Sequence, residues 1–200
     1  IFLHGGFWFR TGREHWSFTA QGILSHGWNV VIPSYPQAPD VKITQITHSI
    51  SKLVYKIFDD CNGSIRMIGH SAGGHLASRM ICKNFLKKNM GNHIEQVISV
   101  SGLYDLRPLL MTKLNDILTL DHEEAVLESC FLYDPIDTKL TCWVGANERP
   151  EFLRQNRILT EAWSKKSRNI ESYYDPGKDH FSVIDQLEEK ESLLTQIITR

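Results

Sequence analysis

Short apolar runs alternate along this chain with longer segments in which apolar residues recur every three or four positions. The short runs predict six buried strands, at residues 1–3, 29–32, 64–68, 97–100, 140–144 and 170–174. The longer segments predict amphipathic helices at residues 13–26, 43–57, 76–87 and 151–166, and a helical region at the C-terminal end. Residues 103–134 are less regular and predict one or two short helices joined by loops.

Strands that alternate with helices of this length predict an α/β protein, because parallel neighbouring strands need crossover helices. We expect a mostly parallel sheet of about six strands with helices on both faces. No repeat or linker interrupts residues 1–200, which predicts a single domain. In the helix after the third predicted strand, Leu76 is expected to point inward, and Arg79, Lys83 and Lys87 outward. Chemistry in such a sheet is expected at the carboxyl ends of the strands.

Composition narrows the class of partner. Lys and Arg number 22 and Asp and Glu 23, giving a net charge of −1, which favours neither nucleic acid nor an anionic membrane as a partner. No apolar run approaches the roughly 20 residues of a membrane span. The cysteines have no metal-binding spacing and predict reduced thiols in a cytoplasmic protein; they are Cys61, Cys82, Cys130 and Cys142. We therefore expect a small-molecule substrate, no metal or cofactor, and a possible homodimer.

The strongest chemical signal is the motif Gly69-His70-Ser71-Ala72-Gly73, which lies between a predicted strand and a predicted helix. In a G-x-S-x-G turn of this kind, the residues two before and two after the serine must lack bulk. The turn then holds the serine hydroxyl clear of the sheet at a helix N-terminus. The motif therefore predicts Ser71 as a nucleophile.

A second motif, His4-Gly5-Gly6-Phe7-Trp8, follows the first predicted strand. Acyl transfer needs backbone N–H groups directed at the developing oxyanion. The loop position predicts these donors as the amides of Gly6, Phe7 and Ala72. His4, Trp8 and His70 flank the site and are candidates for lining a substrate pocket. Phe7, Trp8 and Trp16 are candidates for walls on an aromatic side of that pocket, although core packing explains them equally well.

The general base and its acid partner are expected near the last two strands. His180 is the histidine that follows the final predicted strand, where the chain order nucleophile, acid, histidine places the base. Three carboxylates remain open as the acid: Glu148, Glu151 and Asp105. Glu148 is preferred, because Glu151 is explained by the start of a helix and Asp105 by a helix N-cap.

Together these motifs resemble the α/β-hydrolase superfamily, and within it the kynurenine formamidase branch of the esterase and lipase group. Further points of resemblance extend over most of the chain: Gly74-His75-Leu76-Ala77, Ser101-Gly102-Leu103-Tyr104-Asp105-Leu106, Pro150-Glu151-Phe152-Leu153-Arg154-Gln155-Asn156 and Asp179-His180-Phe181-Ser182-Val183-Ile184. The resemblance implies a triad of Ser71, Glu148 and His180, an oxyanion hole from Gly6, Phe7 and Ala72, and no cofactor.

The chain departs from this family in two ways. Active members usually have Asp as the acid, where this chain has Glu148. The family fold also has strands before the one that leads into the His-Gly-Gly loop, so this chain is expected to be N-terminally incomplete. The resemblance implies cleavage of N-formyl-L-kynurenine to L-kynurenine and formate. One alternative is a general carboxylesterase for small acyl esters, and a second is a non-catalytic binding protein with the hydrolase fold.

Overall fold

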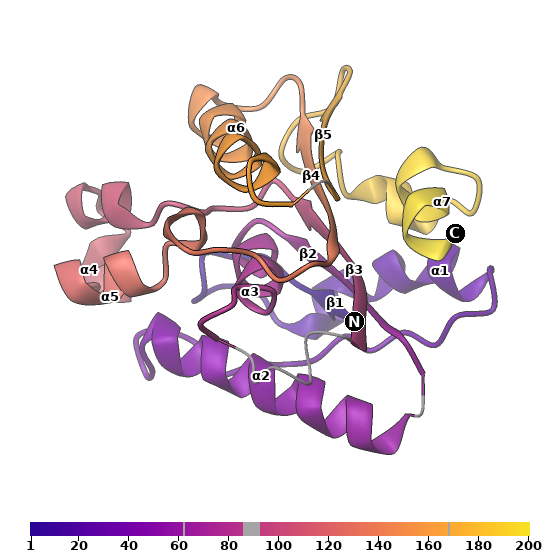
Figure 1. Ribbon diagram of the computed structural model, residues 1–200, viewed down its shortest axis with the longest axis horizontal. Coiled ribbons are helices and arrows are strands. Elements are labelled where there is room, and N and C mark those ends of the chain that lie inside the picture. The colour runs from indigo at the N-terminus through magenta and orange to yellow at the C-terminus, as the bar shows by residue number, and fades with distance from the viewer. Residues whose placement is uncertain (62, 86–92, 168) are drawn as a thin grey trace.

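The computed structural model describes residues 1–61, 63–85, 93–167 and 169–200 (Figure 1). Its centre is a parallel sheet of five strands in the order β1-β2-β3-β4-β5. The strands are β1 (Phe2–Leu3), β2 (Ile65–His70), β3 (Ile94–Val100), β4 (Lys139–Gly145) and β5 (Ile170–Asp175). This confirms the predicted α/β class and the parallel sheet.

Seven α-helices are found in the described residues: α1 (Gln21–Leu24), α2 (Ile43–Asp60), α3 (Ala72–Arg79), α4 (Asn115–Leu118), α5 (His122–Leu127), α6 (Pro150–Ser164) and α7 (Leu193–Thr199). Turns of 3₁₀ helix occupy Arg13–Ala20, Arg107–Met111, Cys130–Leu132 and Asp185–Glu188. The helix predicted at residues 13–26 is therefore mostly a 3₁₀ turn that continues into α1. Residues 103–134 contain the short helices expected there.

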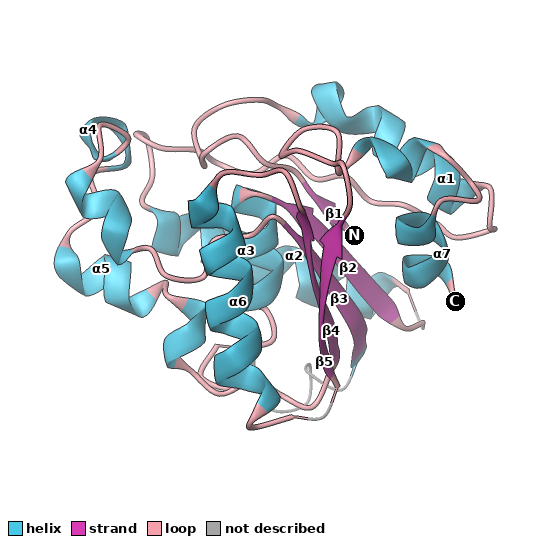
Figure 2. Cartoon of the chain, turned by 90° about the horizontal axis from the view of Figure 1, so that it is seen from above, coloured by secondary structure: helices cyan, strands magenta, loops and turns pink. Residues whose placement is uncertain are grey.

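The helices cover both faces of the sheet (Figure 2). Because the strands follow one another in chain order, right-handed crossovers place the connecting helices α2, α3 and α6 on the same face. The opposite face is covered by α1, which lies early in the connection from β1 to β2, and by α7, which follows β5. Successive side chains of a strand point to opposite faces, so Phe2, Ile68 and Trp143 pack toward α1 and α7, whereas Leu3 and Met67 pack toward α2 and α3.

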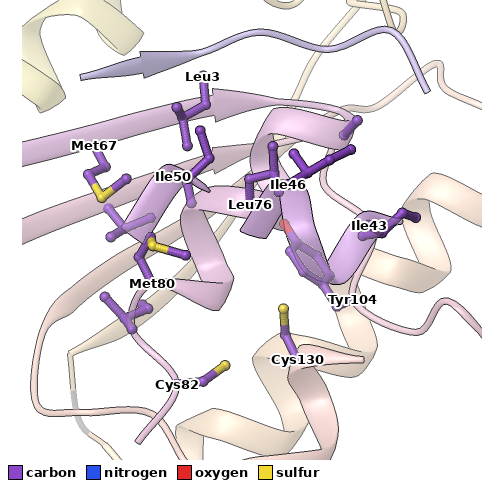
Figure 3. Close-up of a cluster of buried hydrophobic side chains, with 14 of the residues drawn as sticks. Leu3, Ile43, Ile46, Ile50, Met67, Leu76, Met80, Cys82, Tyr104 and Cys130 are labelled. Atoms are coloured by element: carbon purple, nitrogen blue, oxygen red, sulfur yellow. The ribbon is translucent and has the colours of Figure 1, made fainter. Parts of the chain in front are cut away.

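The larger core lies between the sheet and α2, α3 and α6. Ile46 and Ile50 of α2, Leu76 of α3, and Leu3 and Met67 of the sheet meet there with almost no exposure (Figure 3). The three- and four-residue spacing seen in the sequence of α2 is the spacing that brings its isoleucines onto one side of the helix. This packing fixes the strand ends that carry the site.

The strand predicted at residues 29–32 is wrong. That segment runs beside β1, and its one backbone hydrogen bond to β1 joins the N–H of Phe2 to the carbonyl of Val31 at 2.9 Å. Pro33 follows directly and has no N–H with which to extend a ladder. The apolar run is real, since Val30 and Ile32 pack against the smaller core, but it forms no strand.

The expected outward position of Arg79 is also wrong. Its side chain is 1% exposed and its Nε donates to Glu128 Oε2 at 3.1 Å. Lys83 is exposed as expected, and Lys87 lies outside the described residues. The four cysteines are free thiols. Within the described ranges, no helix has the length and apolar character that a membrane span needs.

Candidate active site

Ser71 lies at the sharp turn between β2 and α3. Its φ of 56° and ψ of −117° are a conformation that non-glycine residues seldom adopt. The turn is tight enough to require a glycine two residues later, since a Cβ on Gly73 would lie 1.9 Å from the carbonyl oxygen of Leu3. The N–H of Ser71 donates to the carbonyl of Val100 in β3 at 2.8 Å. The strained serine is thus hydrogen-bonded to β3, and the turn that carries it packs closely against β1.

The structure brings three of the predicted side chains into one chain of contacts. His180 Nε2 lies 3.1 Å from Ser71 Oγ, and His180 Nδ1 lies 2.7 Å from Glu148 Oε2. Ser71 follows β2, Glu148 follows β4 and His180 follows β5, so the carboxyl ends of three parallel strands supply them. The Glu148 side chain is fully buried, whereas that of His180 is 18% exposed. The imidazole therefore connects a buried carboxylate to the serine hydroxyl.

The other two carboxylates that the sequence left open have different partners. Glu151 pairs with Arg154 at 2.7 Å. The hydrogen bonds from Arg154 hold the pKa of the Glu151 carboxyl below its ordinary value. Asp105 pairs with Arg107 at 2.8 Å. Burial alone would raise the pKa of Asp105, but the hydrogen bonds and charge of Arg107 outweigh it and lower the pKa. Of these three carboxylates, Glu148 is the one that contacts His180.

The His4-to-Trp8 loop follows β1 and has a left-handed backbone over several residues. Gly6 has a φ of 111°, and Phe7 and Trp8 have φ values of 56° and 63°. A side chain at Gly6 would collide with the backbone carbonyl of Arg10. The N–H of Arg10 donates to the carbonyl of Gly6 at 2.7 Å. Within the described residues, the N–H groups of Gly6 and Phe7 have no hydrogen-bond acceptor, and neither has that of Ala72 at the start of α3. Three free amides are therefore present in the two loops that flank Ser71.

Comparison with protein families matches residues 1–144 to a family described as the alpha/beta hydrolase fold. This chain belongs to the α/β-hydrolase family. It is similar to the kynurenine formamidase of Danio rerio, with 28% identity over 211 residues that cover 100% of this chain and 71% of that protein. The kynurenine formamidase of Drosophila melanogaster is 24% identical over 200 residues, covering 93% of this chain and 67% of its own length.

Solved structures agree with the family. A crystal structure from Silicibacter sp., of a protein provisionally named as a thioesterase, has a TM-score of 0.93 and 41% identity, and covers 100% of this chain and 74% of that one. An esterase from Pyrobaculum calidifontis has a TM-score of 0.79 at 16% identity, covering 98% and 73%, and shares the fold. The chain is thus a formamidase-like member of the family, which supports hydrolase activity.

The three candidates for lining a pocket in this α/β-hydrolase are buried. His4, Trp8 and His70 are 1%, 1% and 2% exposed. Trp8 Nε1 donates to His75 Nδ1 at 3.2 Å, and the His4 ring stacks on Tyr35 with centroids 4.3 Å apart. None of the three presents a surface to a ligand in this structure, so the function proposed below assigns them no substrate contact. Trp16 is half-buried and packs against His70.

His70 instead contacts the segment that carries His180. Its Nε2 lies 2.8 Å from the backbone carbonyl of His180, and the two rings have centroids 4.8 Å apart. Burial, followed by the charge of His180, lowers the pKa of His70 to about 3. His70 is therefore neutral at physiological pH. A carbonyl only accepts hydrogen bonds, so the proton of His70 lies on Nε2.

Aromatic rings that the sequence reasoning did not single out surround His180. Phe152 stacks on the imidazole with centroids 4.1 Å apart, and Phe181 meets it edge-on at 5.6 Å. Phe181 is 75% exposed and can meet a ligand, and Phe7, in the loop after β1, is 38% exposed. The sequence motifs that contain Phe152 and Phe181 give no sign of these contacts. The distance between Phe152 and His180 depends on how α6 packs against the loop after β5.

Ser101, which follows β3, is a further site residue that sequence reasoning missed. Its hydroxyl donates to Glu148 Oε1, on the side of the carboxylate away from His180. Two features of the sequence point to it: its place at the carboxyl end of a predicted strand, and its place at the start of the motif Ser101-Gly102-Leu103. No group of side chains in the described residues is arranged to hold a metal ion.

A separate apolar cavity of about 540 Å³ lies at the β1 edge of the sheet. Its lining includes Trp28, Val30 and Ile198 as well as residues at the amino end of β2, such as Ser64 and Ile65. Neither Ser71 nor His180 lines it. The cavity is therefore distinct from the candidate active site, which lies at the opposite ends of the strands.

Proposed function

We propose that this α/β-hydrolase is a serine hydrolase that cleaves the formyl amide of N-formyl-L-kynurenine, releasing L-kynurenine and formate. The observation that carries the proposal is the continuous contact from Glu148 through His180 to Ser71, at 2.7 Å and 3.1 Å. Similarity to kynurenine formamidases over the whole chain supports the choice of substrate. Ser71 is assigned as nucleophile, His180 as general base and Glu148 as the acid that orients it.

In the first half of the reaction, Ser71 Oγ attacks the formyl carbon and its proton passes to His180 Nε2. The Glu148 carboxylate stabilises the resulting imidazolium across the 2.7 Å contact with Nδ1. The carbonyl oxygen gains negative charge. We assign the stabilisation of this charge to the free amide N–H groups of Gly6, Phe7 and Ala72. Such donors act strongly because they are already oriented before the charge forms.

Collapse of the tetrahedral intermediate breaks the bond between the formyl carbon and the amine nitrogen. His180 gives its proton to the departing aryl amine, and L-kynurenine leaves. A water molecule then attacks the formyl ester of Ser71 while His180 takes one of its protons. The ester bond breaks, Ser71 Oγ recovers a proton from His180, and formate is released.

The surroundings of His180 fit a substrate with a very small acyl group and an aromatic leaving group. The formyl carbon carries only hydrogen, so a narrow space beside Ser71 suffices. The exposed ring of Phe181 and the half-buried ring of Phe152 offer faces for the aryl amine. A cytoplasmic location, a single domain and a homodimer stay predictions of the sequence.

A second candidate function is hydrolysis of small acyl esters or thioesters. The most similar of the solved structures reported above, at 41% identity, is of a protein provisionally named as a thioesterase, and several structural neighbours are esterases. The proposed machinery would be the same, because Ser71 attacks the carbonyl carbon in each case. The substrates differ only in the leaving group and in the size of the acyl group.

A substrate panel separates these functions. The purified chain is incubated with N-formyl-L-kynurenine, p-nitrophenyl acetate and a short acyl thioester, and kcat/KM is measured for each. The formamidase proposal predicts the highest kcat/KM for the formamide. Faster cleavage of either ester, with no turnover of the formamide, supports the second candidate. Absence of turnover and of labelling by a fluorophosphonate supports a non-catalytic binding protein.

A further inference from the structure

The carboxylate of Glu148 is held by hydrogen-bond donors at both oxygens. Oε2 lies 2.7 Å from His180 Nδ1. Oε1 accepts from the backbone N–H of Gly145 at 2.9 Å and from the hydroxyl of Ser101. The carboxylate has no exposure to water. These three donors therefore replace the solvation that a buried carboxylate loses.

Ser101 is placed by the same strands that place the nucleophile. Its N–H donates to the carbonyl of Trp143 in β4 at 2.7 Å, and the carbonyl of the preceding Val100 accepts from the N–H of Ser71 at 2.8 Å. Ser101 is 1% exposed and has a φ of 52°, which non-glycine residues rarely adopt. Its hydroxyl has no other partner in the described part of the chain. A buried, strained serine thus directs its single donor at Glu148.

The length of the glutamate side chain explains why such a donor is useful. A glutamate has one more rotatable bond than an aspartate, so its carboxylate has more ways to turn away from an imidazole. The Gly145 N–H fixes one direction of approach to Oε1. The Ser101 hydroxyl approaches the same oxygen from a different strand, which leaves Oε2 facing His180.

We propose that Ser101 is a positioning residue that acts through Glu148, holding its carboxylate in the orientation that His180 requires. The proposal rests on the proposed serine hydrolase function and deepens it. It assigns no contact between Ser101 and substrate. Removal of the hydroxyl is expected to lower kcat and leave KM unchanged, because the substrate-binding surface stays the same.

The test is a double-mutant cycle on Ser101 and Glu148, with Ser101→Gly, Glu148→Gln and the double variant. Glycine removes the hydroxyl and suits the positive φ, so the loss of activity is separated from backbone strain. Hydrolysis of N-formyl-L-kynurenine and the rate of fluorophosphonate labelling of Ser71 are measured for each. Thermal unfolding establishes that each variant is folded. Ser78→Ala is the matched control, since Ser78 is a buried serine whose hydroxyl has no partner among the described residues.

Loss of one hydrogen bond to a charge predicts that Ser101→Gly lowers kcat and the labelling rate about 10- to 100-fold. In the Glu148→Gln background, the same change is expected to lower them less than about twofold, because residues that act as a unit are not additive. A full, multiplicative loss in that background overturns the proposal, as does wild-type activity in Ser101→Gly. A wild-type chain that neither labels nor hydrolyses any substrate overturns the proposed function itself.

Discussion

The side chain of His70 donates a 2.8 Å hydrogen bond from Nε2 to the backbone carbonyl of His180. His70 immediately precedes Ser71, so the residue beside the proposed nucleophile holds the loop that carries the proposed base. The two residues are separated by 110 positions in the sequence. This contact joins the end of β2 to the loop after β5.

Replacement of His70 by Phe is expected to lower kcat about tenfold or more while the protein stays folded. Phe keeps a ring beside His180 but removes the donor, leaving a buried carbonyl without its partner, at a cost of about 1–3 kcal/mol. The measurement is kcat and KM for N-formyl-L-kynurenine. His26→Asn is the control, because His26 also contacts a backbone carbonyl, that of Lys190, but is exposed. Equal kcat in His70→Phe and wild type would show that this hydrogen bond does not position His180.

Replacement of Gly73 by Ala is expected to disrupt the turn at Ser71. The added Cβ would lie 1.9 Å from the carbonyl oxygen of Leu3, which is backbone and cannot move aside cheaply. We expect a loss of about 3 kcal/mol or more in the free energy of unfolding, measured with urea. Gly63→Ala is the matched control, since nothing lies within 4 Å of a Cβ there. Similar stabilities of the two variants would contradict the close approach.

Breaking the buried ion pair between Arg79 and Glu128 is expected to lower the free energy of unfolding. Arg79 is 1% exposed and Glu128 fully buried, so Arg79→Met leaves a buried carboxylate without its cation. The expected loss is about 3–5 kcal/mol in urea unfolding. Arg79→Met combined with Glu128→Leu is expected to recover most of it. Lys56→Ala breaks an exposed pair with Asp60 and should leave the unfolding free energy unchanged. A double variant no more stable than Arg79→Met would contradict this account.

Stability is expected to fall as the pH is lowered below about 6.5. Burial holds the pKa of both His70 and His75 at about 3, against an ordinary 6.5 in the unfolded chain. Between these values the unfolded chain binds more protons, so the free energy of unfolding rises with pH by at most about 1.4 kcal/mol per unit for each histidine. Burial also lowers the pKa of His4, which acts in the same direction, and raises the pKa of Glu128, which acts in the opposite direction.

Urea unfolding at pH 7.5, 6.0 and 5.0 measures this dependence. His75→Gln is expected to show a smaller loss on acidification than the wild type, whereas replacement of the exposed His26 should not change the slope. A slope that is identical in wild type and His75→Gln would mean that His75 does not carry the pH dependence.

The strands and the loops of the site could be predicted from local sequence because each has a local cause. A short apolar run that is buried on both faces of a parallel sheet needs no knowledge of its neighbours. The glycines two residues before and two residues after Ser71 predict the tight turn there. The segment at residues 29–32 has the same kind of run, yet a strand also requires a partner along its whole length, and Phe2 provides a single bond.

The remaining differences concern side chains whose partners lie far away in the sequence. The helical pattern placed Arg79 outward, because it gives no sign of Glu128, which lies 49 positions later. The sequence favoured Glu148 over Glu151 and Asp105, but the contact of Glu148 with His180, 32 positions later, forms only when the loops after β4 and β5 meet. Ser101 acquires its contact with Glu148 only when β3 and β4 pair. Such relationships depend on packing between elements and are not visible within any one segment.

The most direct test of the central claim is kcat/KM for N-formyl-L-kynurenine in the wild type, in Ser71→Ala and in Ser49→Ala. Ser49 is a half-buried serine on α2 and serves as the matched control. We predict turnover to L-kynurenine and formate by the wild type and Ser49→Ala, and a loss of at least about 10³-fold in Ser71→Ala. Turnover by Ser71→Ala at the wild-type rate would contradict the assignment of Ser71 as the nucleophile.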